Sequence, residues 1–115
     1  MPIKEIASWQ WNGYAKFHQS RINLLIHIVA VPIFIFAVII FLLALVKWDL
    51  LSLVIAAMLI GLSIGVQGIG HNKEQLPVEP FTGAKNAVTR IILEQLYTFP
   101  KFVLTGGWYA AYRNN

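Results

Sequence analysis

Residues 22–46 read INLLIHIVAVPIFIFAVIIFLLALV, a run of 25 residues without Asp, Glu, Lys or Arg. A second run without these four residue types covers residues 50–72, and only Lys47, Trp48 and Asp49 separate the two. A bilayer core requires about 20 apolar residues of helix. Neither run carries the polar stripe that a helix on the surface of a soluble bundle would show. The sequence therefore predicts two membrane spans, at about 22–46 and 50–71.

The composition supports a membrane protein. The 115 residues are 57% hydrophobic and 12% charged, whereas soluble domains average about half apolar and about a quarter charged. The length fits a single membrane domain covering residues 1–115. No Cys is present, so disulfides and thiolate chemistry are excluded. The net charge of +4 is spread over isolated basic residues, which argues against nucleic-acid binding and favours contact with anionic lipids.

The short turn between the spans predicts an antiparallel hairpin. Most basic residues flank the hairpin rather than the turn: Lys4, Lys16, Arg21, Lys73, Lys85, Arg90, Lys101 and Arg113. By the positive-inside rule, both termini are expected in the cytoplasm, with the hairpin in the inner membrane of a bacterium or the endoplasmic reticulum of a eukaryote. The pair Gly61-x-x-x-Gly65 predicts a close contact between the two spans.

The flanking regions predict further interfacial structure. An N-terminal aromatic segment, with Trp9, Trp11, Tyr14 and Phe17, is expected in the aromatic belt at the membrane surface. Residues 84–99 predict an amphipathic interfacial helix that ends near Pro100. Residues 101–112 are apolar, too short to span, and interrupted by Gly106-Gly107, so they predict an interfacial or re-entrant segment. The expected fold is thus an all-α integral membrane protein.

Three histidines, His18, His27 and His71, are the strongest candidates for chemistry. In an antiparallel hairpin, the start of the first span and the end of the second share one membrane face, so all three imidazoles lie near one depth. Neutral imidazole suits iron, zinc, copper or nickel. A single interfacial histidine can equally bind a headgroup or a backbone carbonyl, so the metal and structural interpretations both stay open.

One geometric condition decides whether the three rings can meet. His18 and His27 are nine residues apart, which places them on opposite sides of a continuous helix. A helix that starts at Ser20 as N-cap would free His18 to fold back toward one metal ion, and the alternative is a dinuclear site. Asn23 shares a helical face with His27 and is predicted to orient its imidazole.

Three carboxylates could complete such a site: Glu74, Glu79 and Glu94. Glu74, three residues after His71, is the predicted catalytic acid, while the i, i+4 spacing of Arg90 and Glu94 favours a structural ion pair over a ligand. The sequence has no glycine-rich phosphate loop and no H-E-x-x-H, so the usual nucleotide-binding and zinc-protease motifs are absent. Residues 61–65 have the spacing G-x-S-x-G, but they lie inside the second predicted span and not at a strand-to-helix turn, so the hydrolase interpretation has no support.

The joint pattern of motifs from Tyr14 to Trp108 resembles a known family. These motifs are Tyr14…His18-x4-Asn23-x3-His27-x4-Pro32, Gln67-Gly68-x-Gly70-His71, Pro77-x-x-Pro80-Phe81, Arg90-x3-Glu94-Gln95 and Phe99-Pro100-x-Phe102-Val103-Leu104-x-Gly106-Gly107-Trp108. They are similar to the yeast 2-hydroxy fatty acid dioxygenase family (Mpo-like), and the C-terminal motifs look like its short bacterial-type branch.

The resemblance implies an Fe(II)-dependent enzyme of fatty acid α-oxidation. With O2, such an enzyme converts a 2-hydroxy fatty acid, or a related hydroxylated lipid, to the acid one carbon shorter and CO2. His18, His27 and His71 match the family's histidines and would hold the iron. Asn23 and Gln67 are expected to orient these ligands without touching the metal. The acyl chain would stay among the membrane lipids while the polar head reaches the metal. A homo-oligomer is compatible with this interpretation.

Two other functions fit the same residues. A small haem-binding membrane protein would use His27 and His71 as axial ligands on facing helices. A non-catalytic structural membrane protein would use the histidines only in hydrogen bonds and would bind no metal.

Overall fold

The structure is a computed structural model that describes residues 2–114, and these residues form six α-helices without a strand. The helices are α1 (Ile3–Tyr14), α2 (Arg21–Lys47), α3 (Leu50–His71), α4 (Ala84–Leu93), α5 (Phe99–Leu104) and α6 (Gly107–Asn114). A 3-10 turn (Ala15–Phe17) follows α1, and a π-helical turn (Glu94–Thr98) joins α4 to α5. The all-α prediction is confirmed.

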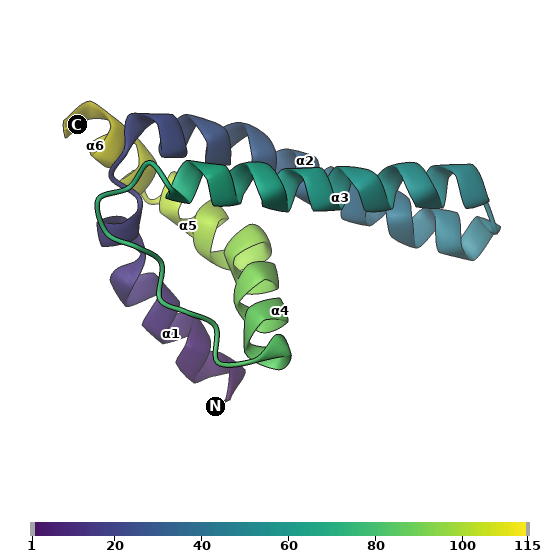
Figure 1. Ribbon diagram of the computed structural model, residues 1–115, viewed down its shortest axis with the longest axis horizontal. Helices are drawn as coiled ribbons and strands as arrows, with labels where there is room; N and C mark the ends of the chain where they lie inside the picture. The colour runs from purple at the N-terminus through teal and green to yellow at the C-terminus, as the bar shows by residue number, and fades with distance from the viewer. Residues whose placement is uncertain (1, 115) are drawn as a thin grey trace.

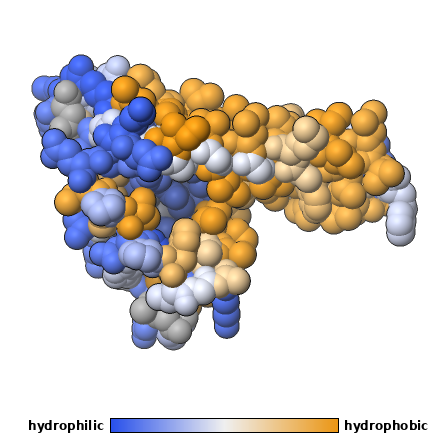
Figure 2. Space-filling view, viewed as in Figure 1, coloured by the Kyte–Doolittle hydropathy of each residue, from blue (hydrophilic) through white to orange (hydrophobic). Residues whose placement is uncertain are grey.

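Helices α2 and α3 form the long arm of the molecule and pack side by side in opposite directions (Figure 1). Trp48 adopts a left-handed conformation that ends α2, and the Asp49 side chain accepts a hydrogen bond from Ser52 N–H to begin α3. Both helices are long and apolar enough to cross a membrane, and only 28% and 17% of their most apolar stretches are buried within the protein. Their outward surface is almost uniformly hydrophobic (Figure 2).

The contact between α2 and α3 relies on small residues, but not on the predicted pair. A Cβ atom at Gly61 or Gly65 would meet nothing within 4 Å, so this glycine face points away from α2 and the predicted packing motif is wrong. The close approach occurs at Gly70 instead, where an added Cβ would collide with the Asn23 side-chain oxygen. Along the rest of the hairpin, buried alanines allow the helices to pack closely: Ala30, Ala37, Ala44 and Ala56.

The remaining helices pack against the end of the hairpin that is farthest from its turn (Figure 1). The aromatic N-terminal segment forms the regular helix α1, which lies beside α4; Gln10 Nε2 donates to Arg90 O at 3.0 Å. Helix α6 is fixed to the start of α2, because Trp108 Nε1 donates to Leu24 O at 2.9 Å and Arg21 Nε donates to Tyr112 O at 2.9 Å. The described ends of the chain therefore both lie on the side opposite the turn.

The predicted helix end near Pro100 is wrong, because helical structure continues to Leu104. Through the π-helical turn the hydrogen bonds widen, and Phe99 N–H donates to Glu94 O, five residues back. This turn ends α4 and places Pro100 in the first turn of α5, where a missing N–H and a fixed φ are tolerated. The predicted break at Gly106 is confirmed; its φ is 84°, a value that favours glycine.

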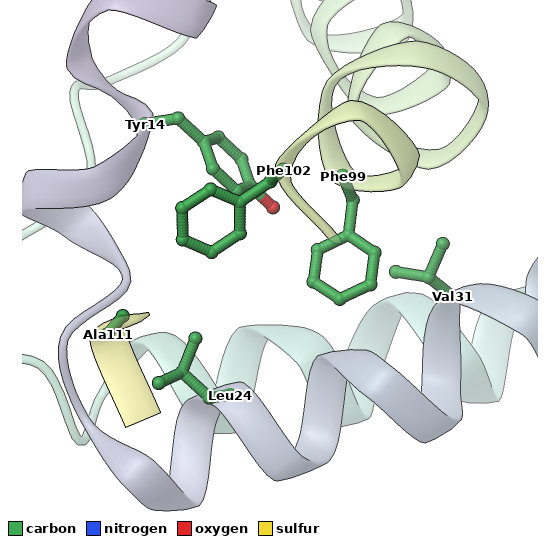
Figure 3. Close-up of a cluster of buried hydrophobic side chains, with 6 residues drawn as sticks. All are labelled: Tyr14, Leu24, Val31, Phe99, Phe102 and Ala111. Carbon is green, nitrogen blue, oxygen red and sulfur yellow. The ribbon is translucent and has the colours of Figure 1, made fainter. Parts of the chain in front are cut away.

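A small apolar core joins the hairpin to this second group of helices (Figure 3). It is built from one or two residues of each helix that meets there: Tyr14, Leu24, Val31, Phe99, Phe102 and Ala111. The Tyr14 and Phe102 rings meet edge to face, with centroids 5.1 Å apart. Tyr14 is only 3% exposed, so its predicted place in a lipid-facing aromatic belt is wrong.

Candidate metal site

The chain breaks between α1 and α2 where the geometry of the histidines requires it. Ser20 is the N-cap of α2, and its side chain accepts a hydrogen bond from Asn23 N–H at 3.3 Å. His18 lies just before the cap in a non-helical conformation, with φ −133° and ψ 64°. The predicted helix start at Ser20 is confirmed, and His18 folds back over the first turns of α2.

Glu74 stabilises this break rather than joining the histidines. Its carboxylate accepts hydrogen bonds from Gln19 N–H at 2.9 Å, from Ser20 N–H at 3.0 Å and from Asn23 Nδ2 at 2.7 Å. A carboxylate at the N-terminus of a helix satisfies free N–H groups and interacts well with the helix dipole. Glu74 thus ties the end of α3 to the start of α2, and its predicted catalytic role finds no support in this geometry.

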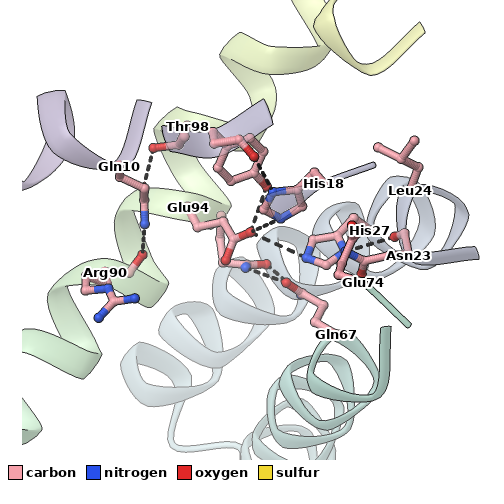
Figure 4. A network of polar contacts seen from close by, with 12 residues as sticks. Gln10, His18, Asn23, Leu24, His27, Gln67, Glu74, Arg90, Glu94 and Thr98 are labelled. Atoms are coloured by element: carbon pink, nitrogen blue, oxygen red, sulfur yellow. Dashed lines mark hydrogen bonds and ion pairs between the residues drawn. The ribbon is translucent and has the colours of Figure 1, made fainter. Parts of the chain in front are cut away.

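The three histidines converge at the base of the hairpin. The centroids of their rings are 5.0 Å apart for His18 and His27, 4.8 Å for His18 and His71, and 4.9 Å for His27 and His71. Glu94 completes the group, with Oε2 at 3.3 Å from His18 Nε2 and 3.4 Å from His27 Nε2 (Figure 4). One ligand atom from each of the four residues lies within 4.8 Å of the other three.

Backbone carbonyls fix the orientation of two rings. His18 Nδ1 lies 2.7 Å from Tyr14 O, and His27 Nδ1 lies 3.0 Å from Asn23 O. A carbonyl oxygen can only accept, so both Nδ1 atoms carry a proton and the Nε2 atoms of the neutral rings present lone pairs to the centre. The predicted role of Asn23 toward His27 is therefore performed by its backbone, while its side chain binds Glu74.

Tyr14 holds the carboxylate of Glu94 in place. Its hydroxyl donates to Glu94 Oε2 at 2.7 Å, and its ring stacks on the His18 imidazole with centroids 3.7 Å apart. Burial, together with the negative charge and hydrogen bond of Glu94, raises the pKa of Tyr14 well above its usual value. The phenol therefore stays protonated and remains a hydrogen-bond donor.

The donor atoms of the cluster fit a cation. Burial raises the pKa of Glu94, but hydrogen bonds and charge from His18 and His27, when these rings are protonated, hold that pKa well below its usual range. When the rings are neutral, a cation between them would supply the same stabilising positive charge. His18 Nε2, His27 Nε2 and His71 Nδ1 are buried without a hydrogen-bond partner. Lone pairs and a carboxylate facing one another repel unless a positive charge lies between them. Three imidazoles and one carboxylate suit iron or another first-row transition metal.

The size of the cluster fits one ion. Two ligands on opposite sides of an ion, each at about 2.1 Å, are about 4.2 Å apart. The ligand atoms here lie within 4.8 Å of one another, so a contraction of a few tenths of an ångström brings them to bonding distance. This geometry favours a mononuclear site over the dinuclear alternative.

A buried amide pair connects the site to the hairpin. Gln67 Nε2 donates to Gln95 Oε1 at 2.9 Å, and Gln95 Nε2 donates back to Gln67 Oε1 at 2.8 Å. Gln67 Nε2 also donates to Ser63 Oγ at 3.1 Å. Because Gln95 follows Glu94 in the chain, Gln67 fixes the turn that carries this carboxylate and contacts no imidazole among the described hydrogen bonds. Its predicted supporting role thus acts on Glu94.

A cavity of about 440 Å³ opens beside the cluster and includes its residues in the wall, a volume typical of small-molecule sites. It lies between α1, α3, α4 and the extended segment 72–83, and its lining is largely apolar. Figure 2 shows hydrophilic residues in a hollow beneath the apolar surface of α3. His18, His71 and Glu94 form the end nearest the cluster, and the lining includes Ile64, Gly68, Val78, Phe81 and Ile91.

Arg90 holds the extended segment over this cavity. Its guanidinium donates to Pro80 O at 3.1 Å and to Glu79 O at 2.8 Å, and it lies 4.4 Å from the centre of the Phe81 ring. No ion pair between Arg90 and Glu94 occurs in the part of the chain that the structure describes, so the predicted i, i+4 pair is wrong. The two side chains diverge because Glu94 turns toward the imidazoles and Arg90 toward the extended segment.

Sequence reasoning identified the three histidines, but it favoured an ion pair with Arg90 for Glu94 and assigned Tyr14 no role at the site. Glu94 reaches the cluster only through the packing of α4 on α1 and of the π-helical turn on α2, and no local spacing links it to a histidine. Tyr14 does carry a local signal, because Tyr14 and His18 are spaced i, i+4, as neighbours on a helical face are.

We expect Tyr14→Phe to weaken metal binding while the fold survives. The change removes only the hydroxyl that fixes Glu94 Oε2, and loss of such an outer hydrogen bond typically costs 10–100-fold in metal affinity. The measurement is competition for Fe(II) against a chelator in anaerobic detergent solution. Tyr109→Phe is the matched control, because Tyr109 is 61% exposed. Equal affinities for the two variants would contradict the assigned role.

The fold and site define an all-helical protein in which three histidines and one carboxylate meet beside an apolar cavity at the base of a hydrophobic hairpin. The comparisons with known proteins give the family. The model of the family described as 2-hydroxy-palmitic acid dioxygenase Mpo1-like matches residues 5–99, which is most of the chain. The protein belongs to this Mpo1-like family. The comparisons with curated proteins and with solved structures returned no match.

Proposed function

We propose that this protein is an Fe(II)-dependent dioxygenase of fatty acid α-oxidation. The observation that carries the proposal is the convergence of three unpartnered imidazole nitrogens and the Glu94 carboxylate at the end of a largely apolar cavity. The family name supports a dioxygenase that acts on a 2-hydroxy fatty acid. His18, His27, His71 and Glu94 would hold the iron.

The reaction balances without an external reductant. A 2-hydroxy fatty acid and O2 yield the fatty acid one carbon shorter, CO2 and water; the bond between the carboxyl carbon and C2 breaks, and both oxygen atoms of O2 are reduced. Bound iron would supply the redox chemistry with O2 and positions for the hydroxyl or carboxylate of the substrate.

The residues of the chain supply orientation, charge and exclusion of water. Glu94 Oε2, which accepts from Tyr14 at 2.7 Å, would supply the negative charge that balances the bound metal ion. The carbonyls of Tyr14 and Asn23 hold the His18 and His27 rings in the tautomer that ligation requires. The core around Phe99 and Phe102 covers the side of the cluster away from the cavity.

The hairpin would place this chemistry at the membrane surface. We propose that α2 and α3 span the bilayer, since their outward faces are apolar along their length. The cluster lies near the start of α2 and the end of α3, about 9 Å into α2 at His27 by the helical rise. Basic residues flank this end, so both termini would face the cytoplasm, in the bacterial inner membrane or in the endoplasmic reticulum.

The compact cluster argues for a single ion over haem. Axial haem ligands approach the iron from opposite sides of a planar macrocycle, which separates their rings. Here His27 and His71 are 4.9 Å apart between ring centroids, and His18 and Glu94 occupy the space between and beside them. A porphyrin plane does not fit among four ligand atoms within 4.8 Å of one another.

The deciding experiment uses protein purified without a polyhistidine tag and loaded with iron under anaerobic conditions. We expect stoichiometric iron by elemental analysis, no Soret band, and release of labelled CO2 from carboxyl-labelled 2-hydroxypalmitate once O2 is admitted. The His71→Ala variant should lose both iron and CO2 release. Wild-type protein without stoichiometric metal would refute the dioxygenase, a Soret band would indicate the haem alternative, and iron without CO2 release would exclude this substrate.

A further inference from the structure

The cavity beside the metal cluster has two chemically different ends, and this difference gives a bound lipid a direction. At one end are His18, His71 and Glu94, and His18 Nε2 lacks a hydrogen-bond partner although His18 is only 3% exposed. Toward the middle of the hairpin, the lining includes Ile64 and Gly68 from α3 and Ile91 from α4, together with the paired Gln67 and Gln95.

The boundary between α3 and α4 is open compared with the rest of the fold. Helix α3 packs chiefly on α2, and α4 packs on α1 and on the π-helical turn. Between α3 and α4 lies the cavity, and the contact across it is the buried Gln67–Gln95 pair, which joins α3 to the turn after α4. Gly68 contributes to this opening, because it is exposed and a Cβ atom added there would meet nothing within 4 Å. By the helical rise, Ile64 lies about 10 Å from His71 along α3, toward the apolar middle of the hairpin.

We propose that the space between Gly68 and Ile64 on α3 and Ile91 on α4 is the channel for the acyl chain of the substrate. This inference rests on the proposed function. The chain enters sideways from the hydrocarbon layer, the 2-hydroxy acid head reaches the histidines, and the absent side chain at Gly68 leaves the width that the chain needs. Gly68 is therefore a specificity-determining residue, whereas Gly61, seven residues earlier on α3, lies outside the cavity lining.

The chain contains no cysteine, so a single introduced thiol reports on this channel without background. Gly68→Cys is the test variant and Gly61→Cys its matched control, because both positions are exposed glycines of α3 with open space around them. The measurement is the rate of alkylation by a maleimide in anaerobic, iron-loaded protein in detergent, where binding occurs without turnover.

At about ten times its Kd, a ligand occupies roughly nine tenths of its sites, so 2-hydroxypalmitate should slow alkylation of Gly68→Cys about ten-fold. The Gly61→Cys variant should react at an unchanged rate. The short acid 2-hydroxybutyrate has the same head without the tail, and it should protect neither variant. Palmitate, which lacks the hydroxyl, distinguishes the substrate chain from lipid in general and should protect much less.

Two results would overturn the channel while leaving the proposed function intact. One is full reactivity of Gly68→Cys although wild-type protein retains labelled 2-hydroxypalmitate through gel filtration. The other is equal protection of both variants, which indicates unspecific lipid along α3. If wild-type protein retains no labelled acid, the proposed substrate itself fails. Ile91→Cys, on the opposite wall, gives the same test should Gly68→Cys fail to accumulate.

Discussion

Glu94→Gln should remove iron from the protein while leaving its fold in place. The amide keeps the shape of the side chain, and its oxygen can still accept the hydrogen bond from the Tyr14 hydroxyl. The negative charge that balances a cation among His18, His27 and His71 is lost. Because removal of a mere supporting partner costs 10–100-fold in metal affinity, loss of a ligand charge should cost at least about 100-fold. Elemental analysis after gel filtration measures the effect.

Glu74→Gln is the matched control for this prediction. Glu74 binds the backbone N–H groups of Gln19 and Ser20, so its neutralisation should lower the free energy of unfolding by about 0.5–2 kcal/mol, as for other helix caps. Its iron content should stay near that of the wild type. If Glu74→Gln lost iron and Glu94→Gln kept it, the roles assigned to the two carboxylates would be reversed, and Glu74 would regain the catalytic role that the sequence predicts for it.

Gly70→Ala should destabilise the hairpin strongly for so small a change. The new methyl group would collide with the side-chain oxygen of Asn23, which packs directly on the α3 backbone. Overpacking of this kind typically costs 1–3 kcal/mol. Displacement of Asn23 would also disturb the capping contact with Glu74 at 2.7 Å and the carbonyl that holds His27. Thermal unfolding followed by circular dichroism in detergent measures the loss of stability, and iron titration measures its effect on the site.

Gly65→Ala, on the same helix, should have the opposite effect. Gly65 has open space around it, so alanine there adds helix propensity without a clash and should raise stability by up to about 1 kcal/mol. A lower midpoint for Gly65→Ala than for Gly70→Ala would show that the two helices approach along the glycine face after all.

The comparison of these glycines shows what the sequence can predict. The long apolar runs determine α2 and α3 almost by themselves, because the membrane-like length and lack of charge leave few alternatives. The start of α2 at Ser20 also follows from local capping chemistry. Local chemistry does not predict which face of α3 meets α2. Gly61, Gly65 and Gly70 are equally small, and only the packed hairpin shows which one lies at the contact.

The site, like the hairpin, is predictable from the sequence only in part. The three histidines are the only ones in the chain, and the hairpin topology brings two of them together. The choice between Glu74 and Glu94 depends on tertiary packing: Glu74, close to His71 in sequence, is drawn to the start of α2, and Glu94 enters through a π-helical turn that periodicity cannot predict. π-helical turns occur frequently at functional sites. In this one, Gln95 and Thr98 are buried in the protein interior and Glu94 faces the histidines.

The four candidate ligands belong to four separate stretches of the chain: the residue after the 3-10 turn, the early part of α2, the end of α3, and the π-helical turn after α4. An ion bound by all of them acts as a reversible cross-link between the hairpin and the helices packed at its base. Such a cross-link contributes its binding energy to folding. If iron is that ion, the iron-bound form would be the more stable one, and chelation should lower the thermal unfolding midpoint.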